Sequence, residues 1–342
     1  TMATMEQQAK QRASRNRTLN LTENEKIFYS SRCLKLSKSL ELENILDKTI
    51  NQNLFSVLEF LPSNAFDLII ADPPYHLTKT FNGRTFRWKT LQDYEDYLES
   101  WIPEMVRLLN PQGSIYICGD WRSSSAVHRV AEKHLEIQNR ITWEREKGRG
   151  ALSNWKNASE DIWFCTKGDT YYFNVEAVKL KRKVVAPYKQ NGKPKDWQET
   201  EEGNFRLTHP SNLWTDISVP FWSMPENTDH PTQKPEKLIA KIILASSKEG
   251  DVIFDPFLGS GTTSVVAKKL GRKYVGVEID ETYCALAQKR LELVEGTKSI
   301  QGYQDGVFLE RNTLSLQQAS LKSKAQLKSD NGKNENTPLF KN

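Results

Sequence analysis

The chain of 342 residues is 37% hydrophobic and 27% charged, and its formal net charge is +5. This length accommodates one large α/β domain with an insertion, or two small domains. So mild a charge permits nucleic-acid binding without demonstrating it. Because no apolar run approaches a membrane span and no signal-peptide pattern opens the chain, we expect a cytoplasmic protein without membrane contact.

The four cysteines, Cys33, Cys118, Cys165 and Cys284, are scattered without a C-x-x-C pair. We therefore expect reduced thiols rather than a disulfide framework or a structural zinc site. His230 lacks a partner His or Cys at ligand spacing, so no metal is expected.

The first 20 residues are rich in Gln, Arg and Asn, which predicts a disordered basic tail. The region 21–173 then alternates between helical and strand-like patterns. In chain order it predicts a short helix at 53–61, a strand at 66–71, a helix at 92–109 kinked at Pro103, a strand at 113–118, a helix at 121–134, and strands at 140–143 and 161–165.

Between residues 174 and 229 this rhythm is lost, and Pro, Asn, Lys and Trp become frequent, which indicates an inserted, loop-rich region. Regular order returns over 230–310. It predicts a helix at 235–246, a strand at 251–254, a helix at 262–270, a strand at 273–277 and a helix at 281–293. Strands alternating with helices imply a mostly parallel sheet covered on both faces. Residues 311–342, a polar run, are expected to form a second disordered tail.

Two short segments follow predicted buried strands. Asp72-Pro73-Pro74-Tyr75 comes after the strand at 66–71, and Asp255-Pro256-Phe257-Leu258-Gly259-Ser260-Gly261-Thr262-Thr263 comes after the strand at 251–254. In an open α/β sheet, ligands bind where loops leave the carboxyl ends of the strands. The sequence therefore places an acidic, aromatic tetrapeptide, suited to a flat base, beside a glycine loop suited to a nucleoside cofactor.

A third segment, His230-Pro231-Thr232-Gln233-Lys234-Pro235, stands just upstream of the glycine loop. With these three motifs in this order, the region from about Asn51 to Glu295 resembles the β group of S-adenosylmethionine-dependent DNA amino-methyltransferases, which modify adenine N6 or cytosine N4. The resemblance implies a Rossmann-like, mostly parallel sheet of seven strands in circularly permuted order. It also implies S-adenosylmethionine as cofactor, double-stranded DNA as substrate, and target recognition by residues 174–229.

The tetrapeptide suits methylation of an exocyclic amine, whose lone pair is delocalised into the base. The Asp72 carboxylate and the Pro73 carbonyl can accept hydrogen bonds from both N–H groups, which frees that lone pair. Pro73 and Pro74 stiffen the turn, and the Tyr75 ring offers a stacking surface for a base flipped out of the helix. In-line transfer to the amine then needs no covalent intermediate.

The glycine loop suits a cofactor because Gly259 and Gly261 allow close backbone approach, and the helix after them presents free N–H groups. A triphosphate-binding loop is not supported because the pattern G-x-x-x-x-G-K-[S/T] is absent. A dinucleotide site is also disfavoured, because it needs G-x-G-x-x-G and this loop has only G-x-G. Glu278, about 20 residues on, is placed to bind ribose hydroxyls. The cofactor site expected by motif and resemblance comprises Asp72, Asp255, Phe257, Gly259, Ser260, Gly261, Thr262, Thr263 and Glu278 with His230, Thr232, Lys234, Pro235 and Asn53.

Asn53 marks a departure from the family pattern. The family usually has a Gly-Asp pair there, whose Asp accepts a hydrogen bond from the cofactor adenine, whereas this chain has Gln52-Asn53. The amide oxygen of Asn53 can still accept that bond, without the charge.

Basic residues between the motifs are candidate contacts to the DNA backbone. They are Lys79, Arg84, Lys147, Arg149, Lys181, Arg182 and Lys183. Trp155, Trp197, Trp214 and Trp222 either stack on bases or form a small core of the inserted region.

An acid leading the tetrapeptide favours adenine N6, since N4-cytosine enzymes usually begin it with Ser and a carboxylate is the stronger acceptor. N4-cytosine methylation, N6 methylation of RNA and a non-catalytic nucleic-acid-binding subunit are the alternatives. C5-cytosine methylation and zinc-dependent deamination are disfavoured, because Pro-Cys and H-x-E with P-C-x-x-C are absent. A homodimer and a cognate restriction endonuclease are partners that the resemblance allows.

Overall fold

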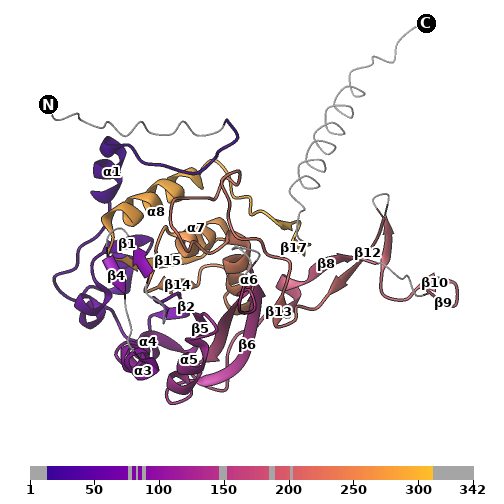
Figure 1. The fold of residues 1–342 in the computed structure, drawn as a ribbon, viewed down its shortest axis with the longest axis horizontal. Coiled ribbons are helices and arrows are strands. Elements are labelled where there is room, and N and C mark those ends of the chain that lie inside the picture. Colours follow the sequence, from indigo (N-terminus) through magenta and orange to yellow (C-terminus); the bar gives the residue numbers. More distant parts are fainter. Residues whose placement is uncertain are drawn as a thin grey trace, which may run out of the picture.

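The computed structural model describes residues 14–75, 79–81, 84–86, 90–145, 152–184, 189–200 and 203–310. Within them, eight strands form a central sheet in the order β1-β15-β14-β2-β5-β7-β6-β13 (Figure 1). Their bounds are β1 Lys48–Asn51, β2 Phe66–Ala71, β5 Leu109–Gly119, β6 Glu136–Glu144, β7 Ser159–Thr166, β13 Leu213–Trp214, β14 Val252–Asp255 and β15 Lys273–Glu278. Only β7 runs antiparallel to its neighbours among these strands. The mostly parallel sheet is confirmed, with β13 as an eighth, two-residue strand beyond the seven expected.

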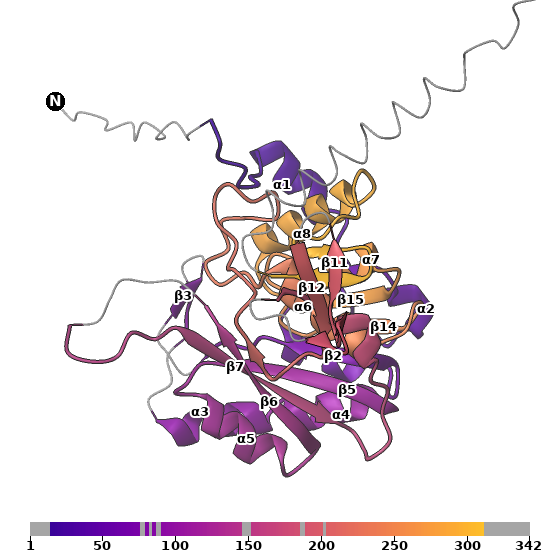
Figure 2. The ribbon, with the colours of Figure 1, turned by 90° about the vertical axis from the view of Figure 1, so that its right-hand side faces the viewer.

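Helices cover both faces of this sheet (Figure 2). On one face lie α3 Leu91–Glu99, α4 Ile102–Leu108 and α5 Ser124–Ala131, and on the other α6 Glu236–Ser246, α7 Thr262–Lys269 and α8 Glu281–Leu293. Strand β2 supplies both cores, because successive side chains of a strand point to opposite faces. Ile69 and Ala71 pack toward α3–α5, whereas Leu68 and Ile70 pack toward α6 and α7.

Several helices differ from their expected bounds. The helix expected at 92–109 is divided into α3 and α4, with Pro103 in the first turn of α4, where its missing N–H costs nothing. The helix expected at 53–61 is two 3₁₀ turns, η1 Leu54–Ser56 and η2 Leu58–Phe60. Two helices were not expected, α1 Glu23–Ser30 and α2 Leu42–Ile45.

Part of the expected N-terminal tail is attached to the fold. The Arg17 N–H donates to the Trp222 carbonyl at 2.6 Å, and the Leu19 N–H donates to the Asn227 carbonyl at 2.8 Å. The prediction of disorder over residues 1–20 is therefore wrong for 17–20, because backbone pairing needs no apolar side chains. Residues 1–13 and the expected tail at 311–342 lie outside the described residues.

The inserted region contains more strand than a loop-rich segment would. After η3 Val175–Val178 come β8 Leu180–Lys183, β9 Lys189–Gln190, β10 Lys193–Pro194, β11 Gln198–Thr200 and β12 Gly203–Thr208. Strands β8, β11 and β12 join β16 Tyr303–Gln304 and β17 Val307–Leu309 in a five-stranded sheet. Figure 1 shows β8 and β12 projecting from the body of the molecule. The inserted region thus forms a sheet with the end of the described chain.

The two motif-bearing strands are neighbours. Strands β14 and β2 pair in parallel with Phe254 opposite Ile69, so Asp255 and Asp72 both lie at the carboxyl-end rim of the sheet. From β14 the chain continues through α7 to β15 on one side, and from β2 through α3 and α4 to β5 on the other. This reversal is the topological switch point at which open α/β sheets bind ligands.

Candidate functional site

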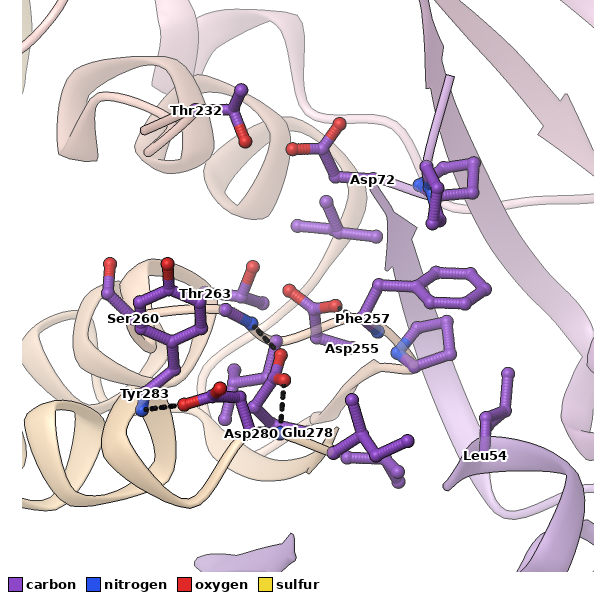
Figure 3. A pocket seen from close by; sticks show the side chains of 18 of the residues that line it. Leu54, Asp72, Thr232, Asp255, Phe257, Ser260, Thr263, Glu278, Asp280 and Tyr283 are labelled. Carbon is purple, nitrogen blue, oxygen red and sulfur yellow. Dashed lines mark hydrogen bonds between the residues drawn. The ribbon is translucent and has the colours of Figure 1, made fainter. Parts of the chain in front are cut away.

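A cavity of about 210 Å³ opens at this switch point, between the ends of β2, β14 and β15 and the segment at 230–234. The expected site residues that line it are Asn53, Asp72, Pro73, Pro74, Tyr75, His230, Thr232, Lys234, Asp255, Phe257, Gly259, Ser260, Thr262, Thr263 and Glu278. Pro235 and Gly261 lie just behind this lining, as the N-caps of α6 and α7. In Figure 3, Asp72 lies across the cavity from Asp255, Glu278 and Asp280.

The glycine loop needs both of its glycines. Gly259 has φ +56°, and a Cβ there would lie 2.9 Å from Nε2 of His230. Gly261 has φ +88°, and its Cβ would lie 2.5 Å from the Cβ of Ala287 in α8. Both positions combine a left-handed backbone with contacts too short for a side chain. The loop is therefore held close to the cavity and to α8.

Three carboxyl groups gather on the cofactor side of the cavity. The Phe257 N–H donates to Oδ1 of Asp255 at 2.9 Å, and burial raises the pKa of Asp255 to about 7. Glu278 accepts from the N–H groups of Gly259 at 2.8 Å and Asp280 at 2.7 Å, and burial raises its pKa as well. Asp280 caps α8. Buried carboxyl groups with raised pKa values suit a ligand that carries positive charge.

His230 is a neutral part of the wall. Burial, helped by the charges of Lys234 and Arg290, lowers the pKa of His230 to about 3. Its Nδ1 lies 3.3 Å from the Thr232 N–H, from which it accepts, and its ring meets the Tyr283 ring edge-on at 4.4 Å between centroids. The imidazole thus shapes the loop at 230–232 without adding charge.

The tetrapeptide belongs to a buried hydrogen-bond network. The Tyr75 hydroxyl donates to Oδ1 of Asp72 at 2.6 Å, and the Lys234 ammonium donates to Oδ2 at 2.7 Å. Lys234 Nζ also lies 2.8 Å from the Tyr75 oxygen and 5.3 Å from the ring centroid. Burial disfavours the ammonium, but the carboxylates of Asp72 and Glu160 outweigh it and raise the pKa of Lys234. Burial also raises the pKa of Tyr75, which therefore remains a donor.

Glu160 of β7 is a site residue that the sequence analysis missed. Its Oε2 lies 3.1 Å from the Tyr75 oxygen and 3.2 Å from Lys234 Nζ, and Arg145 forms an ion pair with its Oε1. Glu160 alternates in phase with the buried Ile162 and Phe164. An acid on an apolar strand face was the one signal for it in the sequence.

Two expected roles change in the structure. Lys234, expected beside the cofactor carboxylate, instead directs its ammonium to Asp72. Asn53 lines the cavity, but its side-chain oxygen already accepts from the Phe55 N–H at 3.0 Å as the cap of η1. An amide oxygen has a second lone pair, so Asn53 keeps acceptor capacity.

The expected DNA contacts on β8 lie away from the cavity lining. Lys181, Arg182 and Lys183 are on β8, and Lys79 and Arg84 begin the hairpin strands β3 Lys79–Phe81 and β4 Arg84–Phe86. Lys147 and Arg149 lie outside the described residues. Of the four tryptophans considered for stacking, Trp197 and Trp214 are buried, while Trp155 and Trp222 are exposed.

Comparison with known proteins matches this geometry. A family described as DNA methylase matches residues 66–289, which span all three motifs. Type II methyltransferase M.HpaI of Haemophilus parainfluenzae is 33% identical over 248 residues, covering 72% of this chain and 74% of that protein. DNA adenine methyltransferase YhdJ of Escherichia coli (strain K12) is 34% identical over 256 residues, covering 71% and 82%.

A solved structure supports the fold. The PvuII DNA methyltransferase (cytosine-N4-specific) superimposes with a TM-score of 0.53 at 18% identity, covering 71% of this chain and 85% of that one. The family match extends over more than half of the chain, and two relatives exceed 30% identity over most of their length. The resemblance drawn from the motifs is thereby confirmed, and the chain belongs to the DNA methylase family.

Proposed function

We propose that this protein is an S-adenosylmethionine-dependent DNA methyltransferase that modifies the N6 amine of adenine in a specific site. The observation that carries the proposal is the position of Asp72-Pro73-Pro74-Tyr75, at the switch point and facing a cavity built by the glycine loop. The acid that leads the tetrapeptide favours adenine. YhdJ, a relative at 34% identity, is named as a DNA adenine methyltransferase.

The residues present fit S-adenosylmethionine. Its sulfonium and ammonium groups are cationic, which suits a cavity wall where burial raises the pKa of Asp255 and of Glu278. Gly259, Ser260 and the first residues of α7 would hold its amino-acid part, while Glu278 and Asn53 would hold the ribose and adenine. When bound, the cofactor supplies a methyl group activated on sulfur.

The acceptors at the end of β2 prepare the target amine. The Asp72 carboxylate and the Pro73 carbonyl accept its two N–H groups, which draws the nitrogen toward tetrahedral geometry and frees its lone pair. The Asp72 side chain is 21% exposed, whereas Tyr75 is 4% exposed. Of these two side chains, Asp72 is therefore the more accessible to the base. Tyr75 lies in the cavity wall and holds Asp72 through its hydroxyl.

Residues 174–229 are proposed to recognise the target sequence, with double-stranded DNA lying across β8 and β12. The projecting sheet and its basic side chains support this position. The regions 21–173 and 230–310 are proposed as the catalytic and cofactor-binding halves, although β1 of the first half pairs with β15 of the second.

A homodimer and a cognate restriction endonuclease remain proposals from the resemblance, and sedimentation velocity of the purified chain checks the first. No helix within the described ranges is long and apolar enough to cross a membrane. A cytoplasmic location is proposed, and cell fractionation tests it.

Radiolabelled methyl transfer to unmethylated bacterial DNA, followed by digestion to nucleosides, tests the proposed reaction. We expect label in N6-methyladenine, reduced by about 10²-fold or more in Asp72→Ala because an acceptor at the reacting amine is lost. Asp96→Ala, which removes an exposed acid of α3, is the matched control and keeps the wild-type rate. Label in N4-methylcytosine, or label only in a parallel reaction that offers RNA, would overturn the adenine-DNA assignment. Absence of label with cofactor still bound would indicate a non-catalytic subunit.

A further inference from the structure

Each carboxylate oxygen of Asp72 already accepts one hydrogen bond. The Tyr75 hydroxyl is 2.6 Å from Oδ1 and the Lys234 ammonium is 2.7 Å from Oδ2. The proposed function requires Asp72 to accept a hydrogen bond from the target amine. Each oxygen keeps a second lone pair, but two donors, one of them cationic, draw negative charge from the carboxylate and weaken it as an acceptor. The bond from Asp72 to the amine is therefore stronger if a donor turns away when the base arrives.

Neither donor can be left without an acceptor at low cost. Tyr75 is 4% exposed and Lys234 is 7% exposed, so water does not readily replace the lost bond. A buried ammonium without a counter-charge is strongly unfavourable, and an unpaired buried hydroxyl costs a smaller amount. A donor that turns away from Asp72 therefore needs a second acceptor within reach.

Glu160 provides that second acceptor. Its Oε2 lies 3.1 Å from the Tyr75 oxygen and 3.2 Å from Lys234 Nζ, so about half an ångström of movement gives each contact ordinary hydrogen-bond length. The Tyr75 hydroxyl has one hydrogen and two carboxylates in reach, so it donates fully to one at a time. A small movement therefore transfers the donors from Asp72 to Glu160.

Glu160 is held in place for this exchange. Its Oε1 forms an ion pair with Arg145, which lies at the end of β6, and the residue itself is 3% exposed on β7. Among the described residues, Asp72 and Glu160 face the cations Lys234 and Arg145. Moving Lys234 from one carboxylate to the other leaves the total charge of this group unchanged, so the exchange needs no proton transfer.

We infer that Glu160 is a positioning residue that takes over the hydrogen bonds of Tyr75 and Lys234, freeing the Asp72 carboxylate for the target amine. The inference rests on the proposed function and extends it to a residue outside the three motifs. It also gives a functional reason for an acid on the otherwise apolar face of β7.

A double-mutant cycle tests this exchange, with single-turnover methylation and cofactor affinity as the two measurements. In Glu160→Gln, Lys234 has one anionic partner left and stays on Asp72. We expect the single-turnover rate to fall about ten-fold or more while the cofactor Kd stays within about two-fold. In a Lys234→Met background the ammonium that must move is gone. Adding Glu160→Gln there should change the rate by less than about three-fold.

Asp161→Asn is the matched control, because Asp161 follows Glu160 on β7 but accepts from Ser124 and Thr142 outside the cavity. It should leave the rate within about two-fold. Glu160→Asp keeps the charge and should recover part of the rate, and thermal melting confirms that each variant folds.

The outcomes separate the two proposals. The role of Glu160 would be overturned if the rate losses of Glu160→Gln and Lys234→Met multiplied independently in the double mutant. It would also be overturned if Glu160→Gln had the wild-type rate. Either result would leave the proposed function standing. If the wild-type protein transfers no methyl group to DNA, the proposed function fails, and the exchange fails with it.

Discussion

Asp255 is a carboxyl group on the cofactor side of the cavity whose ionisation is strongly displaced. Burial raises its pKa to about 7, and the charges of Asp72 and Glu278 add to that effect. No such displacement arises for a carboxyl group in water. Near neutral pH the free protein therefore holds Asp255 partly protonated, and a cationic ligand must favour the ionised form.

The pH dependence of cofactor binding follows from this pKa. Because the raised pKa means that a proton is bound below about pH 7, S-adenosylmethionine affinity should weaken as pH falls, by up to about ten-fold per unit below 7. Above about pH 8 the affinity should be level. Isothermal titration calorimetry from about pH 5.5 to about pH 8.5, a range that brackets this pKa, measures the effect.

Asp255→Asn should bind more weakly at pH 8 and lose most of this pH dependence, because the titrating group is gone. A wild-type affinity that does not change between about pH 6 and pH 8 would contradict a cofactor contact at Asp255.

At the scale of elements, α7 packs against α8 at the glycine loop. The Cβ of an alanine at position 261 would lie 2.5 Å from the Cβ of Ala287 and 2.8 Å from its Cα. The contact involves the backbone of α8, which cannot turn aside as a long side chain would. The glycine at 261 thus sets how closely the two helices approach.

Gly261→Ala should lower the free energy of unfolding by about 2–4 kcal/mol, since a left-handed strain of about 1 kcal/mol adds to the overlap with α8. Cofactor affinity should fall with it. Gly250→Ala is the matched control, because Gly250 has φ +86° with no atom within 4 Å of the added Cβ. Urea unfolding of both variants separates the backbone strain, which both share, from the overlap with α8, which only Gly261→Ala has. Equal losses of unfolding free energy in the two variants would refute the close-packing argument.

Elements with a clear local signal were predictable from the sequence. Strand β2 was expected at 66–71 and has those bounds, because it is a short apolar run that ends at Asp72-Pro73. Helix α1 escaped prediction because its apolar face is short and is completed by α8. The Tyr29 hydroxyl of α1 donates to Oε1 of Glu292 in α8 at 3.1 Å. Strands β8 and β12 were missed because their charged side chains obscure the alternation.

The candidate site was predictable where motifs follow strands, and less so where tertiary contacts decide. Asp72 and Asp255 could be placed together because parallel strands end at one rim. Glu160 and Arg145 could not, because nothing local connects β6 and β7 to the tetrapeptide. Lys234 was found by its motif, but its partner Asp72 lies 162 positions away in sequence.

At the scale of the whole molecule, the basic residues of β8 divide between its two faces. The Nε atom of Arg182 is buried, which places this side chain toward the body. Lys181 faces the other way from its neighbour and lies 4.5 Å from the Phe205 ring centroid. Lys181 and Lys183 are thus the β8 cations available to DNA.

Lys183→Ala should weaken DNA binding at low salt and reduce the slope of log Kd against log salt by about one, because one phosphate contact is lost. Lys273→Ala is the matched control. Lys273 is about half exposed, paired with Asp47, and located at the start of β15, on the rim of the central sheet opposite to the cavity. Fluorescence anisotropy with a labelled duplex measures both. Equal slopes for Lys183→Ala and wild type would place the DNA elsewhere.

The neighbouring positions of β2 and β14 also have a consequence for synthesis on the ribosome. Residues 66–71 emerge early, but their β14 neighbour is residues 252–255, and the edge strand β1 pairs with β15, at 273–278. Contacts so distant in sequence form slowly and late. The nascent chain therefore carries an unpaired side of β2 until most of the protein has been translated. During that interval the exposed strand edge is a site for chaperone binding or for pairing with another nascent chain.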